Sequence, residues 1–231
     1  MGLAIRLAST WLSYRLRPGL PPWRCGACGA TLTFRTWLVA GRWQPRHDPC
    51  SASHLPAGVP VWLLVSISAA LFVSAGAVFS GTVRLPLAWG LVALLLMIAV
   101  IDLERGLILN VLTYPGLALA PAFALLWPDL GLWRSLAGGT AALVIFTALL
   151  RLRRGGLGQG DLKLAVLIGL YLGWPQVLMA LALAFVLGGI VAVAILLAGG
   201  KRSSTFSYGP VLAAGAVIVL LTGEWLLGLV T

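Results

Sequence analysis

Acidic side chains are rare in this 231-residue chain, and three of the six lie at the ends of apolar segments: Asp102, Glu104 and Asp161. A carboxylate close to hydrocarbon is energetically costly, so an acid in that position is a candidate functional residue. The alternative for Asp102 and Glu104 is that they only mark the end of an apolar helix beside Arg105. The remaining acids are scattered along the chain: Asp48, Asp129 and Glu224.

A glycine-rich loop precedes Asp161, because residues 155–161 read GGLGQGD. Glycines give the backbone freedom and let another chain approach closely. The loop is not a phosphate-binding motif, since it follows an apolar helix instead of a strand and lacks the GxGxxG spacing. A flexible linker would not need an acid at the start of an apolar helix, so Asp161 is the second candidate residue.

Two aspartates at one membrane face could share a single proton. Carboxylates about 3 Å apart cannot both be ionised, so the pair would hold one acid and one base. Such a pair can activate a water molecule against a peptide carbonyl while protonating the carbonyl oxygen. The sequence predicts that Asp102 and Asp161 lie at the same membrane face. That their carboxyl groups come close enough to share a proton is a hypothesis.

Other proteolytic chemistries fit the sequence poorly. The two histidines, His47 and His54, precede every clear apolar segment, which excludes a Ser/His or HExxH site inside the membrane. A Ser/Lys site would need Lys163 or Lys201, and no serine lies on a matching helix face.

The elements that must position the aspartates are apolar helices. The chain is 60% hydrophobic and 10% charged, with a mean hydropathy of +1.01, whereas a soluble domain carries about 25% charged residues. Its longest apolar runs lack the period-two alternation of barrel strands. The predicted fold class is therefore all-α, a polytopic helical membrane protein. About seven spans are expected, over residues 59–80, 85–102, 107–127, 134–151, 161–174, 176–198 and 209–230.

The basic residues indicate how the chain is oriented. If residues 1–58 are cytosolic, the loops alternate sides, and 14 of the 16 basic residues lie inside, leaving Arg84 and Arg134 outside. This bias obeys the positive-inside rule. The net charge of +10 therefore predicts contact with anionic lipid headgroups and no nucleic-acid partner.

Residues 1–58 form a compositional unit separate from the membrane domain, residues 59–231. Met1–Leu16 is expected to be an amphipathic segment lying on the membrane, because about 20 residues are needed to cross a bilayer. The polar remainder contains all three cysteines, Cys25, Cys28 and Cys50. The CxxC spacing of the first two fits either metal binding or redox chemistry.

Three stretches resemble the motifs of the prepilin peptidases, the GxGD-type intramembrane aspartic proteases of bacteria. Residues 102–116 resemble the first aspartate motif, residues 158–173 the second, and residues 207–212 the short Gly-Pro motif that opens the family's last helix. The resemblance extends over about residues 59–231. Leu109 departs from it, since a proline usually precedes the asparagine there. The Tyr-Asp pair and Pro-Ala-Leu motif of the presenilin branch do not occur.

The resemblance implies an aspartic endopeptidase of the bacterial inner membrane, with Asp102 and Asp161 as its catalytic residues. Such enzymes cut the leader of type IV prepilins and pseudopilins after a glycine, at the cytosolic face, in pilus assembly and secretion. We assign Gly158, Gly160 and Lys163 to substrate binding, with the glycines letting the substrate backbone lie alongside. Lys163 could instead lower the pKa of one of the two carboxyl groups, or anchor its helix at lipid headgroups. The peptidase reaction needs no cofactor.

Many members also methylate the new N-terminus with S-adenosylmethionine, and their cytosolic module usually carries two CxxC pairs. Here the second pair is incomplete, and no acid lies between Cys28 and His47. We therefore expect little or no methyl transfer. Cys25, Cys28, Cys50 and one histidine would make an acceptable Cys₃His zinc site. The alternative is a degenerate module with free thiols in a reducing cytosol.

A non-enzymatic membrane protein is the alternative to a peptidase, either a small transporter or a scaffold for pilus or secretion assembly. An inverted repeat around broken helices would favour a transporter. The sequence contains no such repeat, and its glycine-rich break occurs once.

Overall fold

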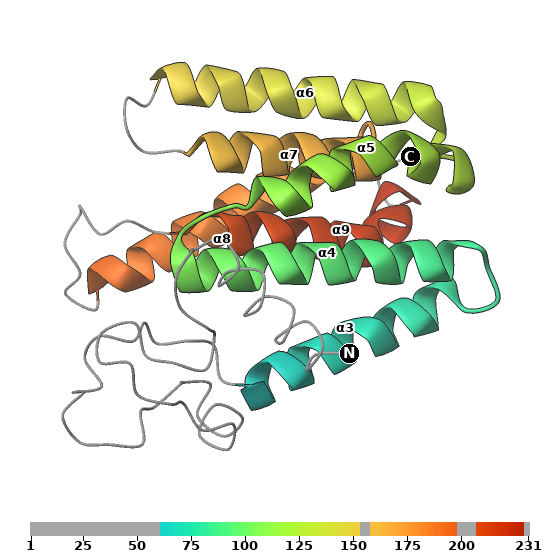
Figure 1. The fold of residues 1–231 in the computed structure, drawn as a ribbon, viewed down its shortest axis with the longest axis horizontal. Coiled ribbons are helices and arrows are strands. Elements are labelled where there is room, and N and C mark those ends of the chain that lie inside the picture. The colour runs from blue at the N-terminus through green and yellow to red at the C-terminus, as the bar shows by residue number, and fades with distance from the viewer. Residues whose placement is uncertain (1–60, 153–157, 198–206, 229–231) are drawn as a thin grey trace, which may run out of the picture.

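The computed structural model describes residues 61–152, 158–197 and 207–228, which form helices joined by short connections (Figure 1). The helices are α3 (Val61–Phe79), α4 (Arg84–Arg105), α5 (Asn110–Leu126), α6 (Gly131–Leu152), α7 (Gln159–Leu172), α8 (Gln176–Leu197) and α9 (Gly209–Gly228). The described ranges contain no strand, which confirms the all-α fold class. The N-terminal unit 1–58, with its three cysteines, lies outside the described residues.

The helices coincide with the seven apolar segments predicted from the sequence, with ends that differ by a few residues. Within the described ranges, α3, α4, α6 and α8 are long and apolar enough to cross a membrane, while α5 and α9 contain shorter apolar stretches. The chain is thus a helical membrane protein, and the number of helices that cross the membrane stays a prediction.

Consecutive helices run in opposite directions along the bundle. The ends of α4, α6 and α8 therefore lie on the same side as the starts of α5, α7 and α9, at the left of Figure 1. We call this side, which carries Asp102 and Asp161, the aspartate end. Arg84 and Asp129 lie at the opposite end, where they form an ion pair of 2.7 Å. The acids are thus sorted between the two ends as the loop alternation predicts.

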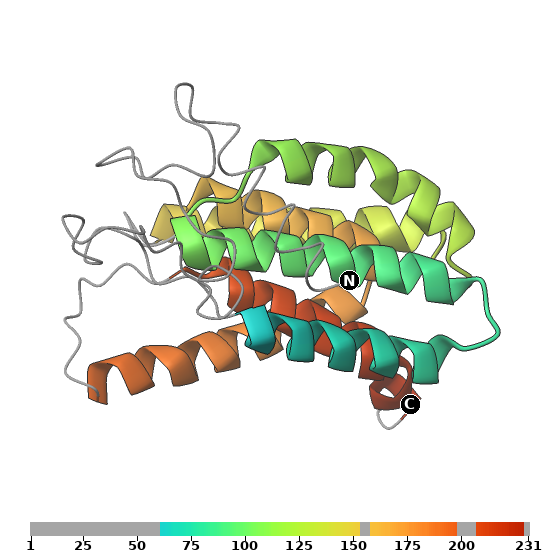
Figure 2. The ribbon, with the colours of Figure 1, turned by 60° about the horizontal axis from the view of Figure 1, so that its bottom comes forward.

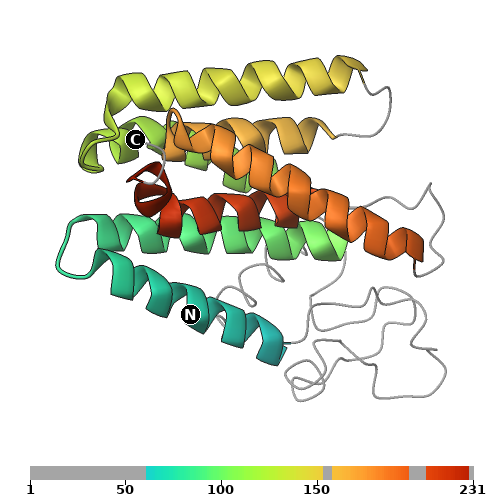
Figure 3. The ribbon, with the colours of Figure 1, turned by 180° about the vertical axis from the view of Figure 1, so that it is seen from behind.

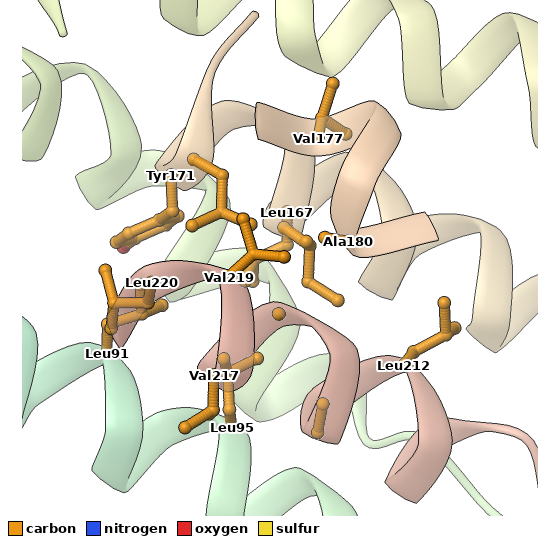
Figure 4. Close-up of a cluster of buried hydrophobic side chains, with 14 of the residues drawn as sticks. Leu91, Leu95, Leu167, Tyr171, Val177, Ala180, Leu212, Val217, Val219 and Leu220 are labelled. Carbon is orange, nitrogen blue, oxygen red and sulfur yellow. The ribbon is translucent and has the colours of Figure 1, made fainter. Parts of the chain in front are cut away.

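The core lies where α9 packs between α4, α7 and α8. Leu91 and Leu95 of α4 meet Val217 and Leu220 of α9, and Leu167 of α7 closes the cluster (Figure 4). On the outer surfaces, α3 lies at the edge of the bundle against α4 (Figure 2), and α8 runs diagonally across α9 (Figure 3). Since lipid is as apolar as the core, such helices associate through close packing.

Small residues provide that close packing between α6 and α7. A side chain at Gly138 would collide with the carbonyl oxygen of Gly169, and Ser135 donates a 2.6 Å hydrogen bond to the carbonyl of Leu170. These contacts fix α7, the helix that carries Asp161. Gly188 of α8 likewise leaves room for the ring of Tyr208, whereas a Cβ at Gly189 would have no neighbour within 4 Å.

Candidate active site

Asp102 lies in the last turn of α4 and is buried, with 4% of its surface exposed. Its helix ends because Gly106 adopts a left-handed conformation with φ 63° and donates its N–H to the Asp102 carbonyl at 2.7 Å. Left-handed backbone suits glycine, which is why this residue closes the helix. The apolar run before Asp102 thus delivers the carboxyl group to the end of the bundle.

The start of α9 holds the Asp102 carboxyl group in place. The N–H of Gly209 donates a 2.9 Å hydrogen bond to Oδ2 of Asp102, and the hydroxyl of Ser207 donates to its backbone carbonyl at 3.0 Å. The N-terminus of a helix carries partial positive charge, which favours a carboxylate there. Neither Ser207 nor Gly209 was identified as a site residue from the sequence, although the Gly-Pro motif at 207–212 was the available signal.

Asp161 is the third residue of α7 and caps its own helix. Its Oδ2 accepts a 3.0 Å hydrogen bond from the N–H of Gly158, which precedes the helix in an extended conformation. This is the carboxylate half of a capping box, in which an acid at the third position binds the N–H before the helix. The glycine-rich sequence therefore positions the second aspartate at the helix start.

The structure places Asp102, near the end of α4, and Asp161, near the start of α7, at the same end of the bundle. The helix α9 packs against both α4, which carries Asp102, and α7, which carries Asp161. In both residues a glycine N–H binds Oδ2, so the two carboxyl groups are held in a similar way. Glu224 lies in the second half of α9, away from this end.

The predicted substrate-binding residues contact other parts of the same chain. Lys163 donates hydrogen bonds to Oδ1 of Asn110 at 2.9 Å and to the hydroxyl of Tyr114 at 3.1 Å. A Cβ built on Gly160 would lie 3.0 Å from Cβ of Ile108, in the α4–α5 connection. Their role toward a substrate stays a prediction. No sequence pattern indicated Tyr114 as a partner of Lys163.

No group of three or more histidine, cysteine or acidic residues suited to a metal occurs in the part of the chain that the structure describes. The candidate zinc ligands Cys25, Cys28 and Cys50 lie outside that part, so zinc binding stays a prediction. Two aspartates can perform acid–base chemistry, in which one carboxyl group gives a proton and the other accepts one.

Comparison with known proteins identifies the family. A family model described as Type IV leader peptidase family matches residues 89–193, a range that includes both aspartates. A prepilin leader peptidase/N-methyltransferase of Burkholderia pseudomallei (strain 1026b) is 31% identical over 226 residues, which cover 88% of this chain and 68% of that protein. The chain belongs to the type IV leader peptidase family.

Further relatives in this family have the same name. The protein of Aeromonas hydrophila is 31% identical over 196 residues, covering 82% of this chain and 65% of its own length. That of Bacillus subtilis (strain 168) is 28% identical over 159 residues, covering 68% of this chain and 64% of its own length. The matched parts thus span about two thirds of these relatives. No solved structure matches the chain.

Proposed function

We propose that this protein is an aspartic endopeptidase that removes the leader peptides of type IV prepilins and pseudopilins. Asp102 and Asp161 are its catalytic pair in this proposal. The observation that carries it is the presence of two carboxyl groups at one end of an apolar bundle, each held through Oδ2 by a glycine N–H. Membership of the type IV leader peptidase family and the names of the relatives support the substrate class.

The hydrogen bonds leave one oxygen of each carboxyl group available. Oδ1 of Asp102 and Oδ1 of Asp161 accept no hydrogen bond from any residue that the structure describes. A fixed Oδ2 and a free Oδ1 give each group a defined orientation toward a water molecule and a peptide bond. Such preorganisation lowers the barrier because little rearrangement is needed during the reaction.

Hydrolysis by the pair follows in two steps. The ionised carboxylate takes a proton from water, the water oxygen bonds to the carbonyl carbon, and the protonated carboxyl group gives its proton to the carbonyl oxygen. The resulting diol then collapses: the newly protonated carboxyl group gives its proton to the amide nitrogen, a diol hydroxyl gives its proton to the other carboxylate, and the C–N bond breaks. The products are a leader with a new carboxyl end and a protein with a new amino end, and the pair again holds one proton.

The distribution of basic residues supports placing the aspartate end at the cytosolic face of the bacterial inner membrane. Arg151 and Lys163 lie at this end in the described residues, and the sequence puts 14 of its 16 basic residues on that side. The protein is then multi-pass, and it meets its substrate where the basic leader of a prepilin lies. Cleavage after a glycine follows from the family resemblance.

N-methylation, the second activity in the relatives' names, is not part of the proposal. The sequence lacks a complete second cysteine pair and an acid between Cys28 and His47. Zinc binding by the N-terminal unit stays a prediction that metal analysis tests.

The proposal is tested with the full chain in vesicles and a prepilin-like peptide, by measuring the masses of both fragments. Asp102→Asn and Asp161→Asn keep the size of the side chain but remove the shared proton, so each should abolish cleavage. Folded yield should stay near that of the unchanged protein, because neutralising an acid in an apolar bundle removes a costly charge. The double variant should be no worse than either single one, since half a pair does not function.

Acids outside the pair provide the matched controls. Glu104→Gln, Asp129→Asn and Glu224→Gln should retain most of the activity. If Glu104→Gln abolishes cleavage while Asp102→Asn does not, the first catalytic acid is wrongly assigned. If both asparagine variants cleave normally, the aspartic mechanism is refuted, and the transporter or scaffold alternative is favoured.

A further inference from the structure

A polar cluster lies between α5 and α7 close to the aspartates. The ammonium group of Lys163 binds Oδ1 of Asn110 at 2.9 Å and the Tyr114 hydroxyl at 3.1 Å, and it lies 4.9 Å from the centroid of the Tyr114 ring. Asn110 begins α5, and Tyr114 follows one turn later. Lys163 therefore ties the first two turns of α5 to the second turn of α7.

Lys163 belongs to the face of α7 that packs on α5. Residues 163, 167 and 171 are four apart, so they follow one face of the helix. Leu167 approaches Gly116 so closely that a Cβ there would lie 2.7 Å from Cδ1 of Leu167, and the Tyr171 hydroxyl donates to the Gly116 carbonyl at 2.9 Å. Lys163 is thus the member of this α5–α7 interface nearest the aspartate end.

Asp161 lies on another face of the same helix. Two residues correspond to a rotation of about 200°, so Lys163 and Asp161 point away from each other. Among the described residues Lys163 forms no ion pair with an acid. The lysine is therefore placed to act through the position of the helices and not by direct contact with the carboxyl group.

The cluster lies on the structural link between the two aspartates. Asp102 is followed by the short connection 106–109, which ends where Asn110 begins α5. Ile108 in the connection lies against Gly160, the residue before Asp161. The connection 106–109 is attached at its start to α4, which carries Asp102. Because Lys163 binds Asn110, its other end is attached to α7, which carries Asp161.

The strength of this tie comes from the charge of the ammonium group. Hydrogen bonds to an ammonium group are stronger than those between neutral groups. The remaining α5–α7 contacts named above lie one and two turns deeper in the bundle. Loss of the ammonium group would thus loosen the aspartate end while leaving the rest of the interface closed.

We infer that Lys163 is a positioning residue for proteolysis, which sets the separation of Asp102 and Asp161 by tying α7 to the start of α5. This inference rests on the proposed function, and it replaces direct substrate binding as the role of Lys163. A positioning residue affects the chemical step, whereas a substrate contact affects mainly the binding of the peptide.

The test compares Lys163→Met with Lys163→Arg in the peptide-cleavage assay. Methionine keeps the length and apolar stem but cannot bind Asn110, so kcat should fall about tenfold to a hundredfold, as a shift of the reacting groups by 1 Å would produce. KM should change less than about twofold, because no substrate contact is lost. Arginine keeps the charge and donors and should restore most of kcat.

Tyr171→Phe is the matched structural control. It removes another hydrogen bond between α7 and α5, to the carbonyl of Gly116, but far from the aspartates. Its thermal unfolding temperature should fall at least as much as that of Lys163→Met, while kcat stays near the unchanged value. Equal losses of kcat in Tyr171→Phe and Lys163→Met would show that Lys163 has a structural role alone, and would overturn the inference.

A second measurement does not depend on cleavage. Spin labels on Leu103→Cys and Gln159→Cys, both exposed positions beside the aspartates, report the distance between α4 and α7 after the native cysteines are replaced by serine. Lys163→Met should broaden or shift this distance, and Lys163→Arg should not.

An unchanged distance, or a raised KM at unchanged kcat, would overturn the positioning role. Cleavage by Asp102→Asn would refute the proposed function instead. The distance measurement would still decide whether Lys163 holds the two helices, so the two failures are distinguishable.

Discussion

Replacing Gly209 by alanine tests the contact between the start of α9 and Asp102. The added Cβ would lie 2.6 Å from Oδ2, 3.1 Å from Cγ and 3.3 Å from Cβ of Asp102. Gly209 is not among the described glycines with positive φ, so alanine can adopt its backbone conformation. Any loss of activity therefore comes from the new contact and not from backbone strain.

The size of the effect follows from the overlap. Carbon and oxygen atoms in favourable contact are about 3.3–3.6 Å apart, so the carboxyl group or α9 must retreat by about 0.7–1 Å. A misplacement of about 1 Å in a reacting group can cost a hundredfold in rate. We expect kcat to fall about thirtyfold to a hundredfold. The free energy of unfolding should fall by about 1–3 kcal/mol, as it does at other overpacked sites.

The assay is cleavage of the prepilin-like peptide, with kcat measured on equal amounts of folded protein. Gly189→Ala in α8 is the matched control, because a Cβ there has no neighbour within 4 Å. This control should keep nearly all activity and stability. An unchanged kcat for Gly209→Ala would refute the reasoning that the start of α9 holds the Asp102 carboxyl group.

Two further predictions concern orientation and the N-terminal unit. Cysteines introduced at Gly156 and Lys201 should react with a membrane-impermeant reagent only from the cytosolic side, and one at Asp129 only from the outside; the reverse pattern would contradict a cytosolic active site. The trimmed product should carry no methyl group after incubation with S-adenosylmethionine, because the cysteine set is incomplete, and stoichiometric methylation would contradict that interpretation. Metal analysis near one zinc per chain would support a Cys₃His site, whereas zinc-free protein would support free thiols.

Much of the helix arrangement follows from the sequence because a membrane limits the choices. Long apolar runs without charges can satisfy their backbone only as helices, so their positions were predicted to within a few residues. Charged residues avoid hydrocarbon, so Asp102 and Asp161 were expected at helix ends on one side. The alternation of short loops then separates them from Asp129. These steps need only local composition and the thickness of the bilayer.

The tertiary structure decided which groups those side chains meet. Gly209, whose N–H binds Asp102, lies 107 positions from it along the chain, and the two partners of Lys163 lie 53 and 49 positions away. Such pairs depend on how each helix is rotated and which helices are neighbours, and a run of apolar residues on every face carries no such information. For the same reason the sequence could not separate Gly188, which packs on Tyr208, from Gly189, which faces open space. Composition determined where the helices and their charged ends lie, and only packing decided which helix faces another and so which atoms surround the aspartates.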